Sequence, residues 1–286
     1  MRRWASVVGI IEYSTAMALV ETRLNYFNPP ADGSKPYQWT IANHPGGGPM
    51  RAIQVENIRG RESSSAFTLD TSGFEFHRIA NQQVISFDDE EEVRTVYYDE
   101  CVRNIKRITG ASRVVIFDHT IRKPRPSGTP ETPQTRSPVR LVHVDQTAES
   151  AARRVELHLP ASDTQTLLSK RFQIINLWRP IENPAWQLPL ALCDFTSVAQ
   201  GDFVPSTLKY LDRDGETMVV KHNPGHRWKY LAGMTPDEFV LIKCYDSTDD
   251  ANVATFTPHT AIDDPTTPQG APDRQSIEIR ALVFYD

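Results

Sequence analysis

Cysteine, long apolar runs and clustered basic residues are all scarce in this sequence. The three cysteines are Cys101, Cys193 and Cys244, and an odd, widely spaced set does not form a disulfide framework. No stretch approaches the roughly 20 apolar residues of a membrane span. With a net charge of −5 and no basic run, the chain lacks a surface that would follow a phosphate backbone. We therefore expect a cytoplasmic protein, a monomer or a homodimer, whose partner is a small molecule and not a membrane or a nucleic acid.

The beginning of the chain sets the expected domain organisation. An early apolar run is interrupted by Glu12, so we do not expect a signal peptide. Residues 23–66 are rich in Pro, Gly, Asn and Ser, which is typical of an extended arm rather than of an independent domain. Since 39% of the residues are hydrophobic, the chain can bury a sizeable core. We expect one domain over 1–286, with an N-terminal arm at 1–66 and helices plus a jelly-roll core at 67–286.

The remaining sequence combines a few helices with many short strands. An apolar stripe behind acidic residues 88–92 predicts a helix that ends at Gly110, and Thr147–Leu157 has helical character. Prolines at 121–138 indicate a long exposed loop. Residues 222–226 indicate a turn that joins two flanking strands. The segments with strand character are 113–117, 139–145, 172–178, 188–195, 217–221, 228–231, 238–245 and 276–284. This mainly β pattern with flanking helices predicts a double-stranded β-helix, that is, a cupin-like jelly roll.

A candidate metal site begins with His143 and Asp145, which are two residues apart on an expected strand. Residues at this spacing point to the same face and can reach one ion. With His259 they form two histidines and one carboxylate, the facial triad of non-heme Fe(II) oxygenases, which leaves coordination positions open. Taken singly, each residue has an ordinary structural explanation, and Asp145 could simply cap the helix that follows. Four other histidines compete with His259 for the third position: His119, His158, His222 and His226.

An organic acid is expected beside this metal. Arg274 and Ser276 share a strand face, and a guanidinium with a hydroxyl can bind a carboxylate. The order of the motifs, H-x-D, then a late histidine, then R-x-S, suggests Fe(II) with 2-oxoglutarate and O2. Arg280 lies on the same face if the alternation is unbroken, so it is a second candidate for the 2-oxoglutarate or a substrate acid.

One more strand offers candidate substrate-binding residues. Asn176 and Trp178 share a face and could line a pocket, although Trp178 could equally belong to the core. Arg179, before Pro180, could orient a substrate carboxylate or pair with an acidic side chain.

Five strings of the chain resemble one fungal family. They are Val142–Thr147, Asn176–Pro180, Pro189–Asp194, Phe256–Thr260 and Arg274–Phe284. They look like the gibberellin desaturase and the AsaB-type hydroxylase/desaturases, with the bacterial cephamycin methoxylation subunit as a distant relative. The resemblance runs from about Leu24 to the C-terminus, and the first 20 or so residues match nothing in it.

This resemblance implies a 2-oxoglutarate-dependent oxygenase of fungal secondary metabolism. The reaction would be hydroxylation, desaturation or ring closure, such as aziridine formation, on a small carboxylate-bearing metabolite such as an amino acid. Two alternatives stay open: a non-catalytic partner subunit of an oxidation system, and a zinc hydrolase that uses the same ligands to activate water.

Overall fold

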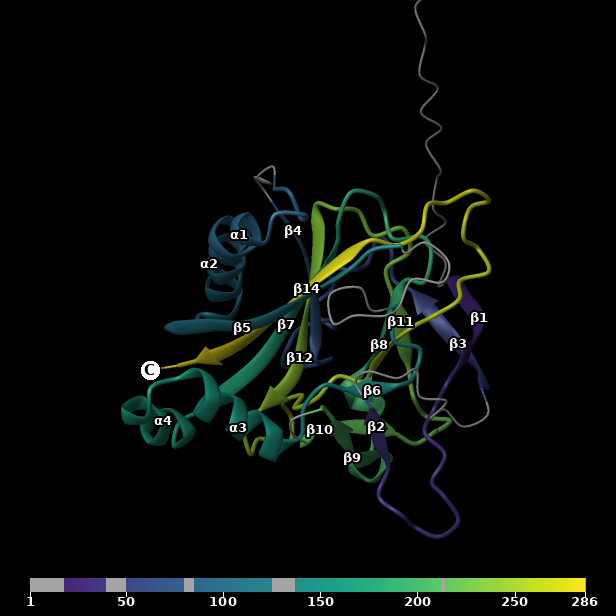
Figure 1. The fold of residues 1–286 in the computed structure, drawn as a ribbon. Helices are drawn as coiled ribbons and strands as arrows, with labels where there is room; N and C mark the ends of the chain where they lie inside the picture. Colours follow the sequence, from purple (N-terminus) through teal and green to yellow (C-terminus); the bar gives the residue numbers. More distant parts are fainter. Residues whose placement is uncertain (1–17, 40–49, 80–84, 125–136, 212–213, 286) are drawn as a thin grey trace, which may run out of the picture.

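The computed structural model describes residues 18–39, 50–79, 85–124, 137–211 and 214–285, and two β-sheets face each other in it (Figure 1). In spatial order, the larger sheet contains β1 (Ala18–Leu24), β3 (Arg51–Asn57), β11 (Trp228–Tyr230), β8 (Leu190–Cys193), β13 (His259–Ala261), β6 (His143–Val144), β10 (Asp214–Val220), β9 (Phe203–Lys209) and β2 (Tyr37–Trp39). The smaller sheet contains β4 (Phe74–Arg78), β12 (Glu238–Asp246), β7 (Phe172–Pro180), β14 (Ser276–Phe284) and β5 (Arg113–Arg122). This arrangement confirms the predicted jelly roll.

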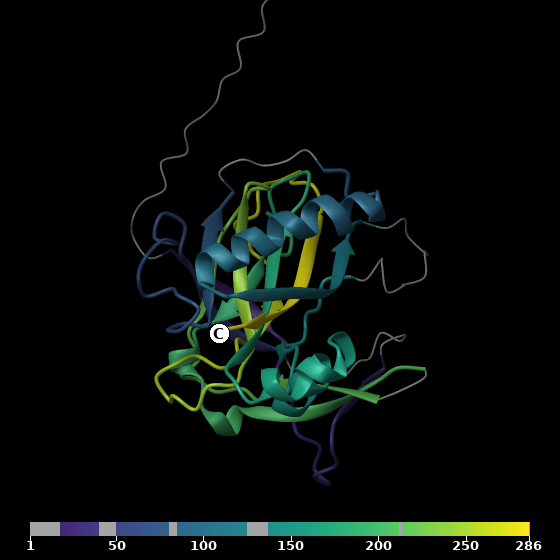
Figure 2. The same ribbon diagram turned by 90° about the vertical axis from the view of Figure 1, so that its left-hand side faces the viewer.

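The central strands of the smaller sheet, β12, β7 and β14, are buried on both faces of the sheet. Every residue of β7 is buried, and successive side chains alternate between the faces. Ile175 and Leu177 belong to a cluster with α2 (Tyr98–Thr109), which lies across the outer face of the sheet (Figure 2). Ile174 and Trp178 belong to the cluster between the two sheets. One strand therefore supports a hydrophobic outer layer and the interior of the jelly roll at the same time.

The helix before β5 begins and ends where the sequence predicts. Asp89 caps α1 (Glu90–Glu92) by accepting hydrogen bonds from the backbone N–H groups of Glu91 and Glu92. A π-helical turn, η1 (Val93–Tyr97), leads into α2. Gly110 follows α2 with φ 71°, the left-handed conformation that glycine adopts readily at a helix C-terminus.

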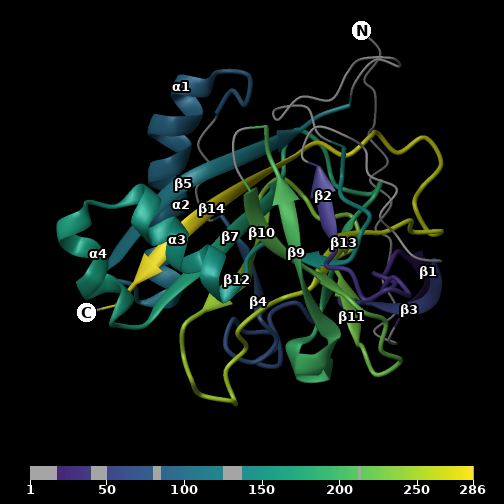
Figure 3. The same cartoon turned by 60° about the horizontal axis from the view of Figure 1, so that its bottom comes forward.

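The second predicted helix, α3 (Ala148–His158), lies beside the metal-ligand candidates. Thr147 is its N-cap and forms a reciprocal capping box with Ser150. Ala151 and Val155 turn toward the cluster between the sheets. A short helix absent from the sequence prediction, α4 (Ala161–Leu168), follows at once, and both helices lie near the C-terminal end of β14 (Figure 3). Two 3-10 turns, η2 (Phe195–Ser197) and η3 (Gln200–Asp202), precede β9.

Two features of the larger sheet go beyond what the sequence predicts. The turn expected at 222–226 joins β10 to β11, but these strands do not pair with each other, because β10 pairs with β6 and β9 whereas β11 pairs with β3 and β8. The arm at 1–66 is more than a draped segment, since it supplies β1, β2 and β3 to the larger sheet. Long-range pairing outweighs the local turn and loop signals in both cases.

Other expectations agree with the structure only within limits. The strand expected at 139–145 is reduced to β6, and the loop expected at 121–138 falls largely outside the described residues, as do residues 1–17. No helix in the described part of the chain is long and apolar enough to cross a membrane.

Candidate active site

The structure brings His143, Asp145 and His259 together. One potential ligand atom from each lies within 4.8 Å of the other two. His143 is the register partner of His259, because β6 and β13 are antiparallel neighbours. The Nε2 atoms of His143 and His259 lie 3.5 and 3.8 Å from Asp145 Oδ1. Two imidazole nitrogens and one carboxylate oxygen thus converge on one point, a donor set that fits Fe(II).

Backbone carbonyls orient both imidazoles toward that point. His143 Nδ1 is 2.7 Å from the carbonyl oxygen of Leu141, and His259 Nδ1 is 3.0 Å from that of Thr257. A carbonyl only accepts, so each Nδ1 carries the proton and each Nε2 presents a lone pair. Burial, together with the nearby His143, lowers the pKa of His259. His259 is therefore neutral near pH 7, as a metal ligand must be.

The carboxylate of Asp145 is held from its other side. Asn176 Nδ2 donates to Asp145 Oδ2 at 2.8 Å, and Arg280 Nε lies 3.5 Å from the same oxygen. Although burial opposes ionisation, the contact with His143 and the charge of Arg280 hold the pKa of Asp145 well below its usual range. Because Thr147 caps α3, Asp145 is not needed as a cap, and its ionised oxygens are available to a cation.

A cavity of about 280 Å³ opens onto the three side chains. Trp178 and Leu190 contribute to its wall, whereas Gln146, Thr217 and Tyr210 make other parts polar. This volume matches a small ligand pocket.

Arg274 lies in the wall of this cavity without a carboxylate partner among the described residues. Its guanidinium sits 5.5 Å from the centre of the Trp178 ring, and its NH1 donates to the carbonyl oxygen of Leu188. The buried Nε has no hydrogen-bond partner. Burial, reinforced by the nearby charge of Arg122, lowers the pKa of Arg274 to about 9. A buried cation in this state favours a bound anion.

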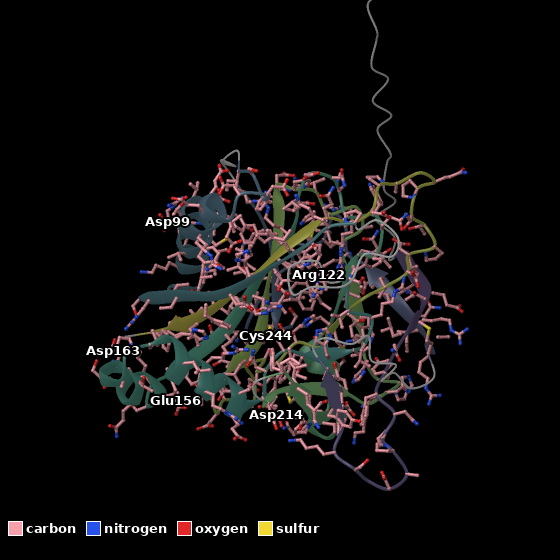
Figure 4. The ribbon with its side chains drawn as sticks, viewed as in Figure 1. Asp99, Arg122, Glu156, Asp163, Asp214 and Cys244 are labelled. Carbon is pink, nitrogen blue, oxygen red and sulfur yellow. The ribbon has the colours of Figure 1, made fainter. Side chains whose placement is uncertain are left out.

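Arg122 is a second arginine of the cavity wall, and the sequence did not point to it. Its register partner across β5 and β14 is Ser276, which is buried and is not among the residues that line the cavity. Figure 4 shows Arg122 toward the middle of the molecule. The structure thus places Arg274 in the cavity wall and Ser276 at the start of the adjoining strand β14.

Arg280 also lines the cavity, but acidic and polar side chains occupy its donors. NH2 donates to Glu278 Oε2 at 2.8 Å, and NH1 donates to Thr120 Oγ1 at 2.9 Å and to Asp118 Oδ2 at 3.3 Å. Three carboxylates, including Asp145, therefore neutralise this one guanidinium. Arg280 supports the metal-site carboxylate and is a poor candidate for an additional anion.

The three residues expected to bind substrate have different positions. Trp178 lines the cavity. Asn176 is buried behind it and divides its amide protons between Asp145 and Glu278. Arg179 points to the other face of β7, where it lies over the rings of Tyr97 and Phe87 at 5.4 and 5.5 Å. The structure therefore does not bring Arg179 to the cavity.

The competing histidines lie in other environments. His226 bonds to Tyr26 and Asp202, His222 contacts the Tyr26 ring, His119 bonds to Tyr98, and His158 stacks on Phe117. None of them joins the cluster of potential ligand atoms formed by the described residues.

Four further charged residues of the cavity wall were not identified from the sequence: Asp118, Arg122, Arg154 and Glu278. Glu278 could have been found, because it alternates with Ser276 and Arg280 on one strand face. Arg154 could not, since its position depends on how α3 packs against the sheets.

Comparisons with known proteins agree with this geometry. Residues 24–284 match a family model described as "Oxidoreductase/YMDC permease-like domain". The hydroxylase/desaturase efuI of Hormonema carpetanum is 33% identical, over 93% of this chain and 95% of that protein. The Fe(II)/2-oxoglutarate-dependent dioxygenase nvfI of Aspergillus novofumigatus is also 33% identical, over 78% and 80%.

A solved structure is also similar to this chain. The iron and alpha-ketoglutarate-dependent endoperoxidase NvfI superposes with a TM-score of 0.80 and 26% identity, over 93% of this chain and 98% of that one. The fold, the triad and these relatives agree, so this chain is an enzyme that belongs to the fungal family of hydroxylase/desaturases and Fe(II)/2-oxoglutarate-dependent dioxygenases.

Proposed function

We propose that this enzyme oxidises a C–H bond of a small, carboxylate-bearing metabolite, with Fe(II), 2-oxoglutarate and O2. One observation carries the proposal: a two-histidine, one-carboxylate cluster and the uncompensated Arg274 line the same cavity. The first arrangement suits iron, and the second suits an organic anion.

In this proposal, His143, Asp145 and His259 hold the iron on one side. Bound together, iron, 2-oxoglutarate and O2 supply the oxidising power for cleavage of an unactivated C–H bond. The protein contributes position. The carbonyls of Leu141 and Thr257 fix the imidazole planes, and Asn176 fixes the carboxylate plane. Such outer contacts orient the ligands and increase their basicity.

Arg274 is the proposed partner for the distal carboxylate of 2-oxoglutarate, with Ser276 beside it. Its partnerless Nε and its stacking on Trp178 leave a fixed donor edge for a carboxylate. Arg280 is the weaker of the two candidates because Glu278, Asp118 and Asp145 already neutralise it.

For the substrate we propose a small organic acid, with an amino acid first and a terpenoid acid second. The cavity is modest in volume and arginine-rich, which favours a compact anion. The related proteins carry names as different as hydroxylase/desaturase and endoperoxidase. Hydroxylation, desaturation and ring closure are therefore the reactions to be distinguished by product analysis.

The two alternatives are less well supported. A non-catalytic partner subunit has no need for a complete triad with oriented imidazoles. A zinc hydrolase has no need for a buried cation such as Arg274 in the wall of the same cavity.

The test is anaerobic absorbance spectroscopy of the Fe(II)-loaded protein. Addition of 2-oxoglutarate should produce a charge-transfer band, and aerobic addition of small acids should then stimulate succinate release. A protein that binds iron but gives no band would be a scaffold or a hydrolase. Stimulation by neutral compounds alone would leave the oxygenase assignment standing and disprove the acidic substrate.

A further inference from the structure

We propose that Arg154 of α3 binds the carboxylate of the substrate. This inference rests on the proposed function, and it names the residue that recognises the substrate carboxylate. No sequence motif points to Arg154. Its role follows from what surrounds it in the folded chain.

Arg154 shares one cavity with the metal-ligand candidates. It lines the same 280 Å³ space as His143, Asp145 and His259. An anion held by Arg154 would therefore keep the rest of a small molecule next to the metal position. Holding a reactant in this way is a major source of rate enhancement.

The guanidinium of Arg154 has no acidic partner in the described part of the chain. Its helical neighbour Arg153 pairs with Glu149 at 2.7 Å. Glu156, two residues further on, is exposed on the outer side of the helix (Figure 4). The sequence of α3 thus neutralises one of two adjacent arginines and leaves the one that lines the cavity uncompensated.

An aromatic stack fixes the position of Arg154. The guanidinium carbon lies 5.3 Å from the centre of the Phe117 ring, and His158 stacks on that same ring with centroids 5.0 Å apart. Stacking occupies the flat face of a guanidinium and leaves the N–H donors along its edge. Arg154 is consequently prearranged for a carboxylate while it makes no competing ion pair with the described residues.

The other arginines of the cavity have other partners. Arg280 is bound by three carboxylates. Arg122 donates to the carbonyl oxygen of Ser137 at 2.6 Å, on the β14 side of the cavity, where Arg274 is the proposed 2-oxoglutarate ligand. This leaves Arg154 for the substrate.

The experiment is calorimetric titration of the anaerobic Fe(II)- and 2-oxoglutarate-loaded enzyme, in which no turnover occurs. The probes are aliphatic and aromatic carboxylic acids and amino acids, each measured beside its methyl ester. The wild-type enzyme and Arg153→Gln, the matched control on the same helix, should bind acids more tightly than esters. Arg154→Gln should bind the acids at least tenfold more weakly, with ester binding unchanged.

The charge-transfer band with 2-oxoglutarate tests the proposed oxygenase function separately from the proposed role of Arg154. A normal band in Arg154→Gln with lost acid binding supports both the oxygenase and the role of Arg154. Equal acid binding in wild type and Arg154→Gln, or a panel in which no acid binds better than its ester, overturns the role of Arg154 while the band still supports the oxygenase. Absence of the band in the wild-type enzyme overturns the proposed function itself.

Discussion

The two faces of the smaller sheet differ sharply although they are built from the same strands. On the inner face, Asn176 and Arg280 surround the carboxylate of Asp145. On the outer face, Ile175 and Leu177 pack under α2 together with Ile279. The side chains alternate between the two faces along β7 and β14. One residue therefore contributes to the site while its neighbour in sequence packs in the hydrophobic layer.

Two buried arginines, Arg179 and Arg274, show the same difference between a structural role and a ligand-binding role. Arg179 on the outer face is 1% exposed and lies between Tyr97, Phe87 and Glu100. Arg274 is 8% exposed, yet it lines the cavity and has no acidic partner among the described residues. Burial alone thus does not distinguish a structural arginine from a ligand-binding one. The neighbouring groups do, and substitutions on each face should separate the two roles.

The largest expected effect comes from removal of a metal ligand. His259→Ala should lower iron affinity at least about 100-fold and abolish turnover, because removing even an outer-shell contact costs 10- to 100-fold. Iron content and succinate release would measure this, with circular dichroism to check the fold. The matched variant is His226→Ala, a buried histidine outside the cluster. If His226→Ala lost its iron and His259→Ala kept it, the ligand assignment would be wrong.

The next prediction separates the roles of two arginines that line the cavity, Arg274 and Arg280. Arg274→Ala should weaken 2-oxoglutarate binding by roughly 2–5 kcal/mol, since one carboxylate is left unpaired in a buried site. Iron affinity should be largely retained. Arg280→Ala should instead lower iron affinity and thermal stability, because it leaves Asp145, Glu278 and Asp118 close together without their cation. Titration of the charge-transfer band would measure the affinities for 2-oxoglutarate and for iron in each variant. If Arg280→Ala lost 2-oxoglutarate binding and Arg274→Ala lost iron, the roles assigned to the two arginines would have to be exchanged.

How far the sequence predicts this site depends on the range of the interactions. The spacing of His143 and Asp145 and the alternation in β14 are local sequence patterns, and both are present in the folded structure. The same alternation already places Arg179 opposite Asn176 and Trp178, so its assignment to the substrate site was avoidable. Residue spacing cannot place Arg154, because the packing of α3 brings it to the cavity.

The fold shows the same limit. The helix that ends at Gly110 was predictable, since its apolar stripe and its left-handed terminal glycine are local signals. The pairing of β10 with β6 and of β11 with β3 was not, because those partners lie far away in sequence. A turn sequence such as 222–226 shows that the chain reverses, but it does not show which strands then pair.

A smaller effect is expected on the outer face. Arg179→Met should destabilise the fold by roughly 1–3 kcal/mol, because it leaves Glu100 buried without its cation and removes the contacts with two rings. The affinities for iron and 2-oxoglutarate should not change, since Arg179 does not line the cavity. Chemical denaturation and the charge-transfer titration would measure the two properties. If Arg179→Met lost substrate-stimulated turnover but kept its stability, Arg179 would belong to the substrate site after all.

The smallest effect concerns the pH dependence of stability and the buried His226. Trp228 donates to the Tyr26 hydroxyl at 2.8 Å, and that hydroxyl can in turn donate to His226 Nδ1 at 2.9 Å while Nε2–H donates to Asp202 at 3.1 Å. With the bonds in these directions the imidazole of His226 is neutral. Burial lowers the pKa of His226 despite the raising effect of Asp202. Between the folded pKa and the ordinary value near 6.5, the unfolded chain therefore binds more protons than the folded one.

It follows that His226 makes the free energy of unfolding fall as the pH drops below about 7, by at most about 1.4 kcal/mol per pH unit. In the metal-free protein, His226→Asn should lose less stability than the wild type between pH 7.5 and 5.5, because it lacks the imidazole of His226. Both proteins contain the other histidines, so their contributions cancel in the comparison. Asp202 does not interfere, since a carboxylate with a lowered pKa loses its contribution only at more acidic pH. Denaturation curves at the two pH values give the difference directly. Parallel losses in both proteins would show that His226 is protonated as easily in the fold as outside it, and that the bonds to Tyr26 and Asp202 do not fix its neutral form.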